Sequence, residues 1–203
     1  GEKLGGCAFT EPNAGSDLSA IETRAERVSG GWRLQGRKNF ITNAGTEMSL
    51  GPIVLARTAA DRFGFFVAPA GTPGFELGPN LEKMGWRSMD TRELIFDECL
   101  LPGDHLLGEN DVNGIRQATE TLAIGRISVA ALSLGLARAC LDASLAYALE
   151  RVQFGRPLAS HQAIRFKLAD MGTRLEMARL ITMKAAWLYD RGEPYRQEAA
   201  MAK

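Results

Sequence analysis

Hydrophobic positions change their spacing near the middle of the chain. In the first half, short apolar runs are separated by glycine, proline and polar turn residues, which is typical of strands joined by tight turns. The predicted strands are Ile21–Val28, Trp32–Thr42, Ile53–Arg57, Gly64–Ala68 and Glu93–Asp97. Ser29-Gly30-Gly31 predicts a hairpin turn between the first two strands, because glycine tolerates positive φ. This half of the chain predicts an antiparallel β-sandwich or barrel.

In the second half, apolar residues recur every three or four positions from Asn113 to Arg151, which predicts one long helix. A second helix is expected after Pro157, with Ser160 as its N-cap. Its apolar positions step by four and three, as in the seam of a helical bundle: Ile164, Leu168, Met171, Leu175 and Ala178. Gly192 and Pro194 predict the end of this helix.

These patterns predict an α+β chain with two domains. Residues 1–108 are expected to form the β-domain, and residues 109–203 the first part of a four-helix bundle of long antiparallel helices. The last residues, Gln197–Lys203, are helix formers with neither a glycine cap nor a proline stop. We therefore expect the chain to be a segment of a longer protein.

Composition narrows the possible functions. The chain has 24 basic and 24 acidic side chains, so no net field draws it to nucleic acid or to anionic lipid. We expect no membrane span, because no uninterrupted apolar run approaches the ~18 residues that a span needs. Cys7, Cys99 and Cys140 are odd in number and far apart, which favours neither a disulfide framework nor a metal site and suggests a reducing compartment.

Two segments of the first half combine residue types that bind ligands. Phe9–Asp17 reads Phe-Thr-Glu-Pro-Asn-Ala-Gly-Ser-Asp, and the backbone N–H groups of Gly15 and Ser16 suit a phosphate or pyrophosphate. The same composition is equally typical of a simple turn. Gly36–Ala44 carries Phe40 and Thr42 at a strand end, where they could face a planar ligand or only lead into a turn.

A third segment joins the two predicted helices. It reads Glu-Arg-Val-Gln-Phe-Gly-Arg-Pro-Leu from Glu150 to Leu158 and is followed by His161 and Gln162. Arg151 could hold phosphate groups through its guanidinium fork, or it could only stabilise the C-terminus of the preceding helix. Arg126, inside the long helix, has no assigned role on these grounds, since helical arginines are usually solvated.

Taken together, in this order and spacing, the three segments resemble the acyl-CoA dehydrogenase family. The stretch Lys83–Leu94 and the sequence Leu168-Ala169-Asp170-Met171 resemble the family too, so the likeness covers almost the whole chain. The resemblance implies a middle β-domain followed by a helical bundle. It also implies FAD as cofactor, a homotetramer or homodimer in which a neighbouring subunit completes each flavin site, and a role in fatty acid metabolism.

The resemblance also assigns residues. Cys7, Phe9 and Thr10 fall at one edge of the flavin ring, and Gly15 and Ser16 at its pyrophosphate. Phe40, Ile41 and Thr42 fall at the flavin face and near its N5 atom. The residues that would reach the FAD of the partner subunit are Arg151, Gln153, Phe154, His161 and Gln162. Ser16 and Arg126 fall at acyl-CoA contacts.

The implied reaction is α,β-desaturation of an acyl-CoA thioester, with acyl-CoA as substrate and an electron-transfer flavoprotein as electron acceptor. The family takes its catalytic glutamate either from a later bundle loop or from the position before the helix arginine, which is Gly125 here. The catalytic residue is therefore unknown. Two alternatives stay open, a flavin oxidase acting on acyl-CoA and a non-catalytic subunit of a hetero-oligomer. The expected location is the bacterial cytoplasm or the mitochondrial matrix.

Overall fold

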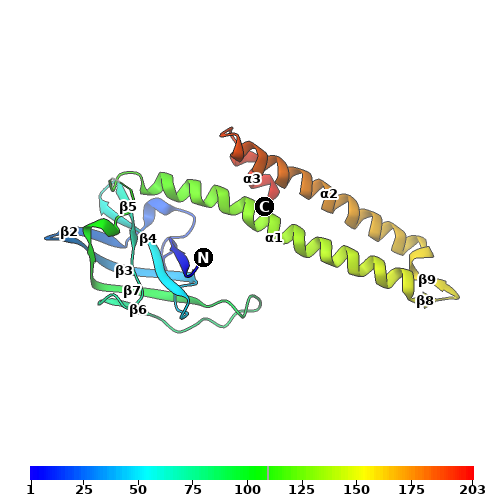
Figure 1. Cartoon of the computed structure of the whole chain (residues 1–203), viewed down its shortest axis with the longest axis horizontal. Coiled ribbons are helices and arrows are strands. Elements are labelled where there is room, and N and C mark those ends of the chain that lie inside the picture. The colour runs from blue at the N-terminus through cyan, green and yellow to red at the C-terminus, as the bar shows by residue number, and fades with distance from the viewer. Residues whose placement is uncertain (109) are drawn as a thin grey trace. The chain divides into compact units, whose positions relative to one another are not determined.

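The protein is described by a computed structural model that covers residues 1–108 and 110–203. The chain divides into two compact units, Gly1–Thr119 and Glu120–Lys203. The first unit is built from strands and the start of a long helix, and the second is helical (Figure 1). The predicted α+β class is confirmed. The predicted domain boundary between residues 108 and 109 falls at Glu109, which lies outside the described residues, and stays a prediction.

Seven strands form the sheet of the first unit. Their bounds are β1 Leu4–Ala8, β2 Arg24–Val28, β3 Gly31–Thr42, β4 Ser49–Ala59, β5 Arg62–Val67, β6 Phe75–Leu77 and β7 Thr91–Pro102. Each of the five predicted strands overlaps one of these, with ends that differ by up to five residues. Strands β1 and β6 were not predicted, because the Leu-Gly-Gly-Cys-Ala sequence of β1 lacks β-branched and aromatic residues.

The strands pair in the order β1-β4-β2-β3-β7-β6, and β5 pairs with β4 from Ile53 to Ala59. The sheet is mixed, because β1 and β2 each run parallel to β4 while the other pairs are antiparallel. The predicted antiparallel pairing therefore holds for four of the six strand pairs and is wrong for the two pairs that β1 and β2 form with β4. Because β1 and β2 are both parallel to β4, they also run parallel to each other and cannot be joined by a tight turn. The loop Phe9–Thr23 makes the connection between them. That loop contains the first candidate segment.

Strand β3 changes register twice against β7. The first break lies between Leu34 and Gly36, and the second lies between Lys38 and Ile41. At the second break Phe40 has a φ of 59°, in the left-handed region that bulky side chains rarely occupy. The result is that Lys38 and Ile41 are both buried while Phe40 is 62% exposed. One strand therefore presents an inward cation and an outward aromatic ring two residues apart.

The second unit is a pair of long helices joined by a small hairpin. Helix α1 spans Gly114–Glu150, α2 spans Gln162–Asp190 and the short α3 spans Arg196–Ala202, with strands β8 Val152–Gln153 and β9 Arg156–Pro157 between α1 and α2. Single turns of 3-10 helix lie at Leu18–Ala20, Gly103–His105 and Leu158–Ser160. The long helix predicted from Asn113 to Arg151 is confirmed to within one residue at each end.

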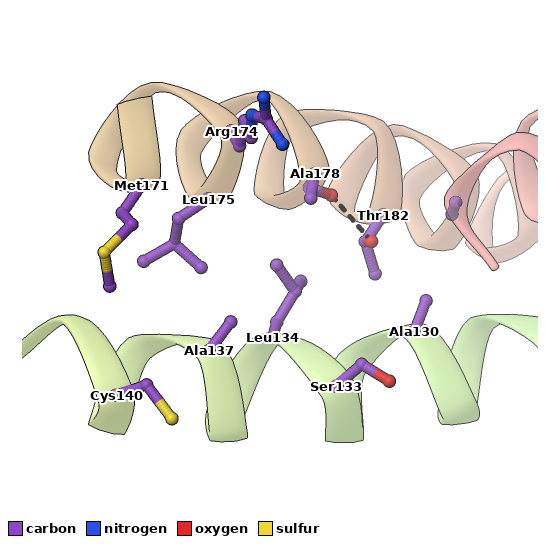
Figure 2. Close-up of a pocket in the computed structure, with 11 residues that line it drawn as sticks. Ala130, Ser133, Leu134, Ala137, Cys140, Met171, Arg174, Leu175, Ala178 and Thr182 are labelled. Atoms are coloured by element: carbon purple, nitrogen blue, oxygen red, sulfur yellow. Dashed lines mark hydrogen bonds between the residues drawn. The ribbon is translucent and has the colours of Figure 1, made fainter. Parts of the chain in front are cut away.

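Helices α1 and α2 run side by side in this unit and face each other through apolar residues (Figures 1 and 2). Leu134 and Ala137 of α1 lie opposite Met171, Leu175 and Ala178 of α2, across a groove of ≈ 400 Å³. These three α2 residues are the last three of the five predicted seam positions, for which the prediction is thereby confirmed.

The ends of α2 were predicted with mixed success. The helix ends at Asp190, just before Gly192 with its φ of 67°, as predicted. The predicted N-cap was wrong, because the N-cap is His161. Ser160 instead belongs to the preceding 3-10 turn, where its hydroxyl donates to the Pro157 carbonyl at 2.7 Å.

Helix α1 is long and apolar enough to cross a membrane by length and composition, with an 18-residue window of mean hydropathy 1.5. The expectation of no membrane span therefore cannot rest on apolar content alone. One such helix is weak support for a span, because apolar bundle helices pass the same test. Arg138 and Asp142 form an ion pair on α1 at 2.9 Å, and charged groups are costly inside a bilayer.

Candidate functional site

The loop that follows β1 is closed by its own backbone. The N–H of Glu11 donates to the Ala14 carbonyl at 2.8 Å, and the N–H of Ala14 returns a bond to Glu11 at 3.3 Å. At the end of the segment, Asp17 accepts from the N–H of Ser19 at 2.9 Å and caps the first 3-10 turn. The turn interpretation of Phe9–Asp17 is therefore correct as a description of its backbone, and it does not exclude a ligand.

This loop lies against the end of β3. The N–H of Asn39 donates to the Thr10 carbonyl at 2.8 Å, so Thr10 lies beside Asn39. Gly6 of β1 lies against the same strand end, because a Cβ built on Gly6 would be 2.6 Å from the Thr42 carbonyl oxygen. The structure thus brings together two of the predicted segments, Phe9–Asp17 and Gly36–Ala44.

Not every residue predicted in these segments offers its side chain. Phe9 and Ile41 are buried, at 8% and 2% exposure, and Phe9 packs on the ring of Phe65 with centroids 5.3 Å apart. These two residues can contribute only backbone atoms to a ligand site. Phe40 presents its ring to solvent, and Cys7 is exposed on β1.

The loop carries several hydrogen-bond donors that have no acceptor within the described residues. They are the N–H and hydroxyl of Thr10, the N–H of Gly15, and the N–H and hydroxyl of Ser16. Asp17, which directly follows Ser16, accepts from the N–H and the hydroxyl of Ser19. The Thr42 hydroxyl lies 3.5 Å from the Thr91 hydroxyl, a contact at the limit of hydrogen-bond distance. This donor set suits an anionic or carbonyl-rich ligand.

A buried ion pair lies beneath the loop. Lys38 of β3 is completely buried, and its Nζ donates to Glu11 Oε1 at 2.7 Å and to the Phe9 carbonyl at 3.1 Å. Burial lowers the pKa of Lys38 to about 8, although the Glu11 carboxylate acts in the opposite direction. Burial also raises the pKa of Glu11, but the charge of Lys38 and the hydrogen bonds outweigh burial and hold it below its ordinary value.

The sequence analysis quoted Lys38 and Glu11 without giving either a role. A signal was available in the alternation of β3. Trp32, Leu34 and Lys38 all occupy even positions of the strand, so the lysine falls on the inward face. Lysine is almost never fully buried without a partner, which requires a nearby carboxylate.

The third predicted segment forms the hairpin of the second unit. Phe154 and Gly155 both have positive φ and make the tip, where the Phe154 ring is 95% exposed. His161 holds the hairpin closed, because its Nε2 bonds to the Gln153 carbonyl at 3.1 Å and its Nδ1 faces the Arg156 guanidinium at 3.2 Å. A carbonyl only accepts and a guanidinium only donates, so these partners assign the proton to Nε2.

Two arginines of the second unit were predicted to meet different ligands. Arg151 is exposed, and its guanidinium has no acceptor in the part of the chain that the structure describes. Arg126 lies on α1, about 37 Å before the hairpin at ~1.5 Å per residue. The structure therefore does not bring Arg126 together with Arg151, Gln153, Phe154, His161 and Gln162.

Comparison with known proteins connects both units to one family. The family model described as the acyl-CoA dehydrogenase middle domain matches residues 6–99, and the model of the acyl-CoA dehydrogenase C-terminal domain matches residues 112–203. The chain is 43% identical over 208 residues to the probable acyl-CoA dehydrogenase YngJ of Bacillus subtilis, covering 100% of this chain and 54% of that protein.

Further relatives agree. The human mitochondrial short-chain specific acyl-CoA dehydrogenase is 44% identical over 207 residues, covering 100% of this chain and 50% of its own length. The structure of butyryl-CoA dehydrogenase from Megasphaera elsdenii superimposes with a TM-score of 0.92 at 42% identity, covering 98% of this chain and 53% of that chain. The chain thus spans about half the length of the relatives that it matches. It belongs to the acyl-CoA dehydrogenase family.

Proposed function

We propose that the full-length protein is a flavin-dependent acyl-CoA dehydrogenase that introduces an α,β double bond into an acyl-CoA thioester. The observation that carries the proposal is the group of donors on the Phe9–Asp17 loop without acceptors in the described residues, in a chain of this family. Residues 1–108 are proposed as the FAD- and acyl-CoA-binding domain, and residues 109–203 as the first part of the helical domain.

The donor set fits FAD in its chemistry. A flavin ring presents carbonyl oxygens and ring nitrogens, which the N–H and hydroxyl of Thr10 would hold. A pyrophosphate presents anionic oxygens, which suit the adjacent N–H groups of Gly15 and Ser16. Phe40 offers an exposed aromatic face directly after Asn39, whose N–H bonds to Thr10. Cys7, Phe9, Ile41 and Thr42 complete the proposed set in the first unit.

We assign the remaining residues to contacts in an assembled protein. Arg151, Gln153, Phe154, His161 and Gln162 are proposed to reach the FAD of a neighbouring subunit, which makes the protein a homo-oligomer. An uncommitted arginine fork matches a pyrophosphate well, through two parallel charge-assisted hydrogen bonds. Ser16 and Arg126 are proposed to contact the acyl-CoA substrate.

When bound, FAD supplies the acceptor for the hydride that leaves the β-carbon of the substrate. The role of this chain's residues is to bind the cofactor and orient it. Thr10 and Thr42 would direct hydrogen bonds to the cofactor, and buried Phe9 and Ile41 would fix the backbone that carries these threonines. The α-proton requires a base, and the proposal assigns none among these 203 residues.

The test uses full-length protein loaded with FAD, mixed anaerobically with a panel of acyl-CoA thioesters. The panel starts with butyryl-CoA, because the relatives compared above include a butyryl-CoA dehydrogenase and a short-chain specific enzyme. Loss of the oxidised flavin absorbance with at least one thioester is expected, and free CoA is the control. No loss with any member of the panel would contradict the proposed function.

A second experiment separates the proposal from its alternatives. Reduced enzyme that reacts slowly with oxygen and rapidly with an electron-transfer flavoprotein is the expected result, and fast reaction with oxygen would indicate an oxidase. A non-catalytic subunit would bind FAD without reduction by any thioester. The proposal places the protein in fatty acid metabolism, in the bacterial cytoplasm or the mitochondrial matrix.

A further inference from the structure

The ion pair of Lys38 and Glu11 joins β3 to both ends of the loop Phe9–Thr23. Lys38 comes from β3 and Glu11 from the loop after β1. Just before β2 begins, the N–H of Glu22 donates to Glu11 Oε2 at 2.7 Å, and the N–H of Thr23 donates at 3.0 Å to Oε1, the oxygen that also accepts from Lys38. Both side chains are buried, with 0% and 3% of their side-chain surface exposed.

Stability alone is a poor explanation for this pair. Two charges must lose their hydration to be buried, and well-packed apolar residues of similar volume often stabilise a core equally well or better. A buried ion pair can instead serve to fix one arrangement of the groups around it.

The contacts of the pair fall on both sides of Thr10. Lys38 holds the carbonyl of Phe9 before it and the carboxylate of Glu11 after it, and the N–H of Asn39 holds the carbonyl of Thr10 itself. These acceptors of the loop are therefore committed to β3. The N–H and hydroxyl of Thr10 have no acceptor in the described residues. The same anchoring that occupies the acceptors leaves the Thr10 donors available.

We propose that Lys38 and Glu11 are positioning residues that fix the direction in which Thr10 presents its donors to the bound flavin. This inference rests on the proposed function, because it needs FAD at the Phe9–Asp17 loop. Neither residue is proposed to touch the cofactor. Their effect on flavin binding is expected to pass through Thr10.

A double-mutant cycle on FAD affinity tests this directly. The variants of the full-length protein are Glu11→Gln, Thr10→Val and the two combined, with FAD dissociation constants measured by titration of the apoprotein. Glu11→Gln keeps the shape of the side chain and removes its charge. The matched control is Glu26→Gln, which removes the same charge from an exposed ion pair with Arg33 on the neighbouring strands.

Glu11→Gln is expected to weaken FAD binding about ten-fold in the wild-type background, the loss typical of one charge-assisted hydrogen bond. In the Thr10→Val background the same change is expected to cost no more than about three-fold, because its route through the hydroxyl is already gone. The flavin absorbance spectrum of Glu11→Gln should shift toward that of Thr10→Val. Glu26→Gln should change neither quantity.

Equal losses in the two backgrounds would overturn the inference and show that the pair is merely structural. If Glu11→Gln yields too little folded apoprotein, the combination of Lys38→Met with Glu11→Gln removes both charges and takes its place in the cycle. If the wild-type protein binds FAD but Glu11→Gln causes equal losses in both backgrounds, this inference alone is contradicted. Wild-type protein that takes up no FAD contradicts the proposed function and this inference together.

Discussion

Lys38 gives the first unit a stability that depends on pH in an unusual direction. In the fold its pKa is about 8, against an ordinary value of 10.5. The unfolded chain therefore holds this proton more tightly, and the contribution of Lys38 to stability is complete above pH 10.5 and is lost as pH falls through 8. Replacing Lys38 should remove this dependence.

The comparison of wild type with Lys38→Met between pH 7.5 and 10.5 measures the effect. The difference in unfolding free energy should move in favour of the wild type as pH rises, by up to about 3 kcal/mol over the interval, since one pKa unit corresponds to ~1.4 kcal/mol. Urea unfolding at each pH provides the values. Titration of Cys99, whose pKa burial raises to about 11, is common to both proteins and cancels. A difference that stays constant with pH would contradict the assignment.

Arg151 gives a second prediction for a single residue. Arg151→Ala in the assembled full-length protein should speed FAD release by about ten-fold, because a charge-assisted contact to a phosphate is lost. Arg165→Ala is the control, since Arg165 is an exposed arginine on α2 with no acceptor in the described residues. Gel filtration at successive times, with flavin fluorescence of the protein fraction, measures how much FAD each variant retains. Equal retention by both variants would remove Arg151 from the proposed site.

At the scale of elements, the two glycines of β1 differ sharply in what surrounds them. A Cβ on Gly6 would meet the Thr42 carbonyl oxygen at 2.6 Å, whereas a Cβ on Gly5 would find its nearest neighbour at 3.9 Å. Gly6→Ala must therefore separate β1 from the end of β3. Gly5→Ala fits in ordinary contact.

Gly6→Ala should lower the unfolding free energy by about 1–3 kcal/mol, the usual effect of overpacking. It should also weaken FAD binding, because Thr42 moves with its carbonyl. Gly5→Ala is expected to change both quantities little. Thermal melting and apoprotein titration on the two variants make a matched comparison, and equal behaviour would show that the close approach of β1 to Thr42 is unimportant.

Elements also show where sequence patterns suffice. Helix α1 was predicted within one residue because its period of three and four residues runs uninterrupted for ten turns. Strand β1 escaped detection because glycines and small residues carry no strand signal, although the close approach to Thr42 demands them. The parallel pairing of β1 with β4 depends on contacts between distant segments, which no local pattern records.

In the candidate site too, some residues were predicted from local motifs, whereas others depend on contacts between distant segments. Thr10 and Phe40 were singled out by motif, and the hydrogen bond from Asn39 to Thr10 shows that their segments meet. The positioning pair was not found, because its partners are 27 residues apart and only the alternation of β3, which places Lys38 on the inward face, points to it. The N-cap position of His161 was missed for a similar reason, since its side chain makes no cap hydrogen bond and its ring instead contacts Gln153 and Arg156 of the hairpin.

At the scale of the whole molecule, the second unit exposes more apolar surface than a monomeric unit usually does. Large side chains more than half exposed occur on both long helices, and they include Leu136, Leu149, Phe166, Met177, Leu180, Met183 and Trp187. Extended apolar surface of this kind marks contact sites for other protein surfaces. The 203-residue chain on its own is expected to self-associate.

Leu136→Lys combined with Met177→Lys should shift the chain toward monomer in sedimentation velocity and should lower its binding of a hydrophobic dye. Met84→Lys is the control, because Met84 is 99% exposed but lies in a loop of the first unit. A chain that is already monomeric at tens of micromolar would contradict this prediction.

The second register break of β3 limits how this part of the protein can change over time. Without it, Lys38, Phe40 and Thr42 would share one face, so the cation and the aromatic ring would compete for the same side. Losing or gaining one residue between Lys38 and Ile41 would exchange the inward and outward sets along the rest of the strand. The number of residues in this stretch is therefore as important for the fold as their identity. A one-residue deletion here is expected to be tolerated only together with an insertion in the same strand.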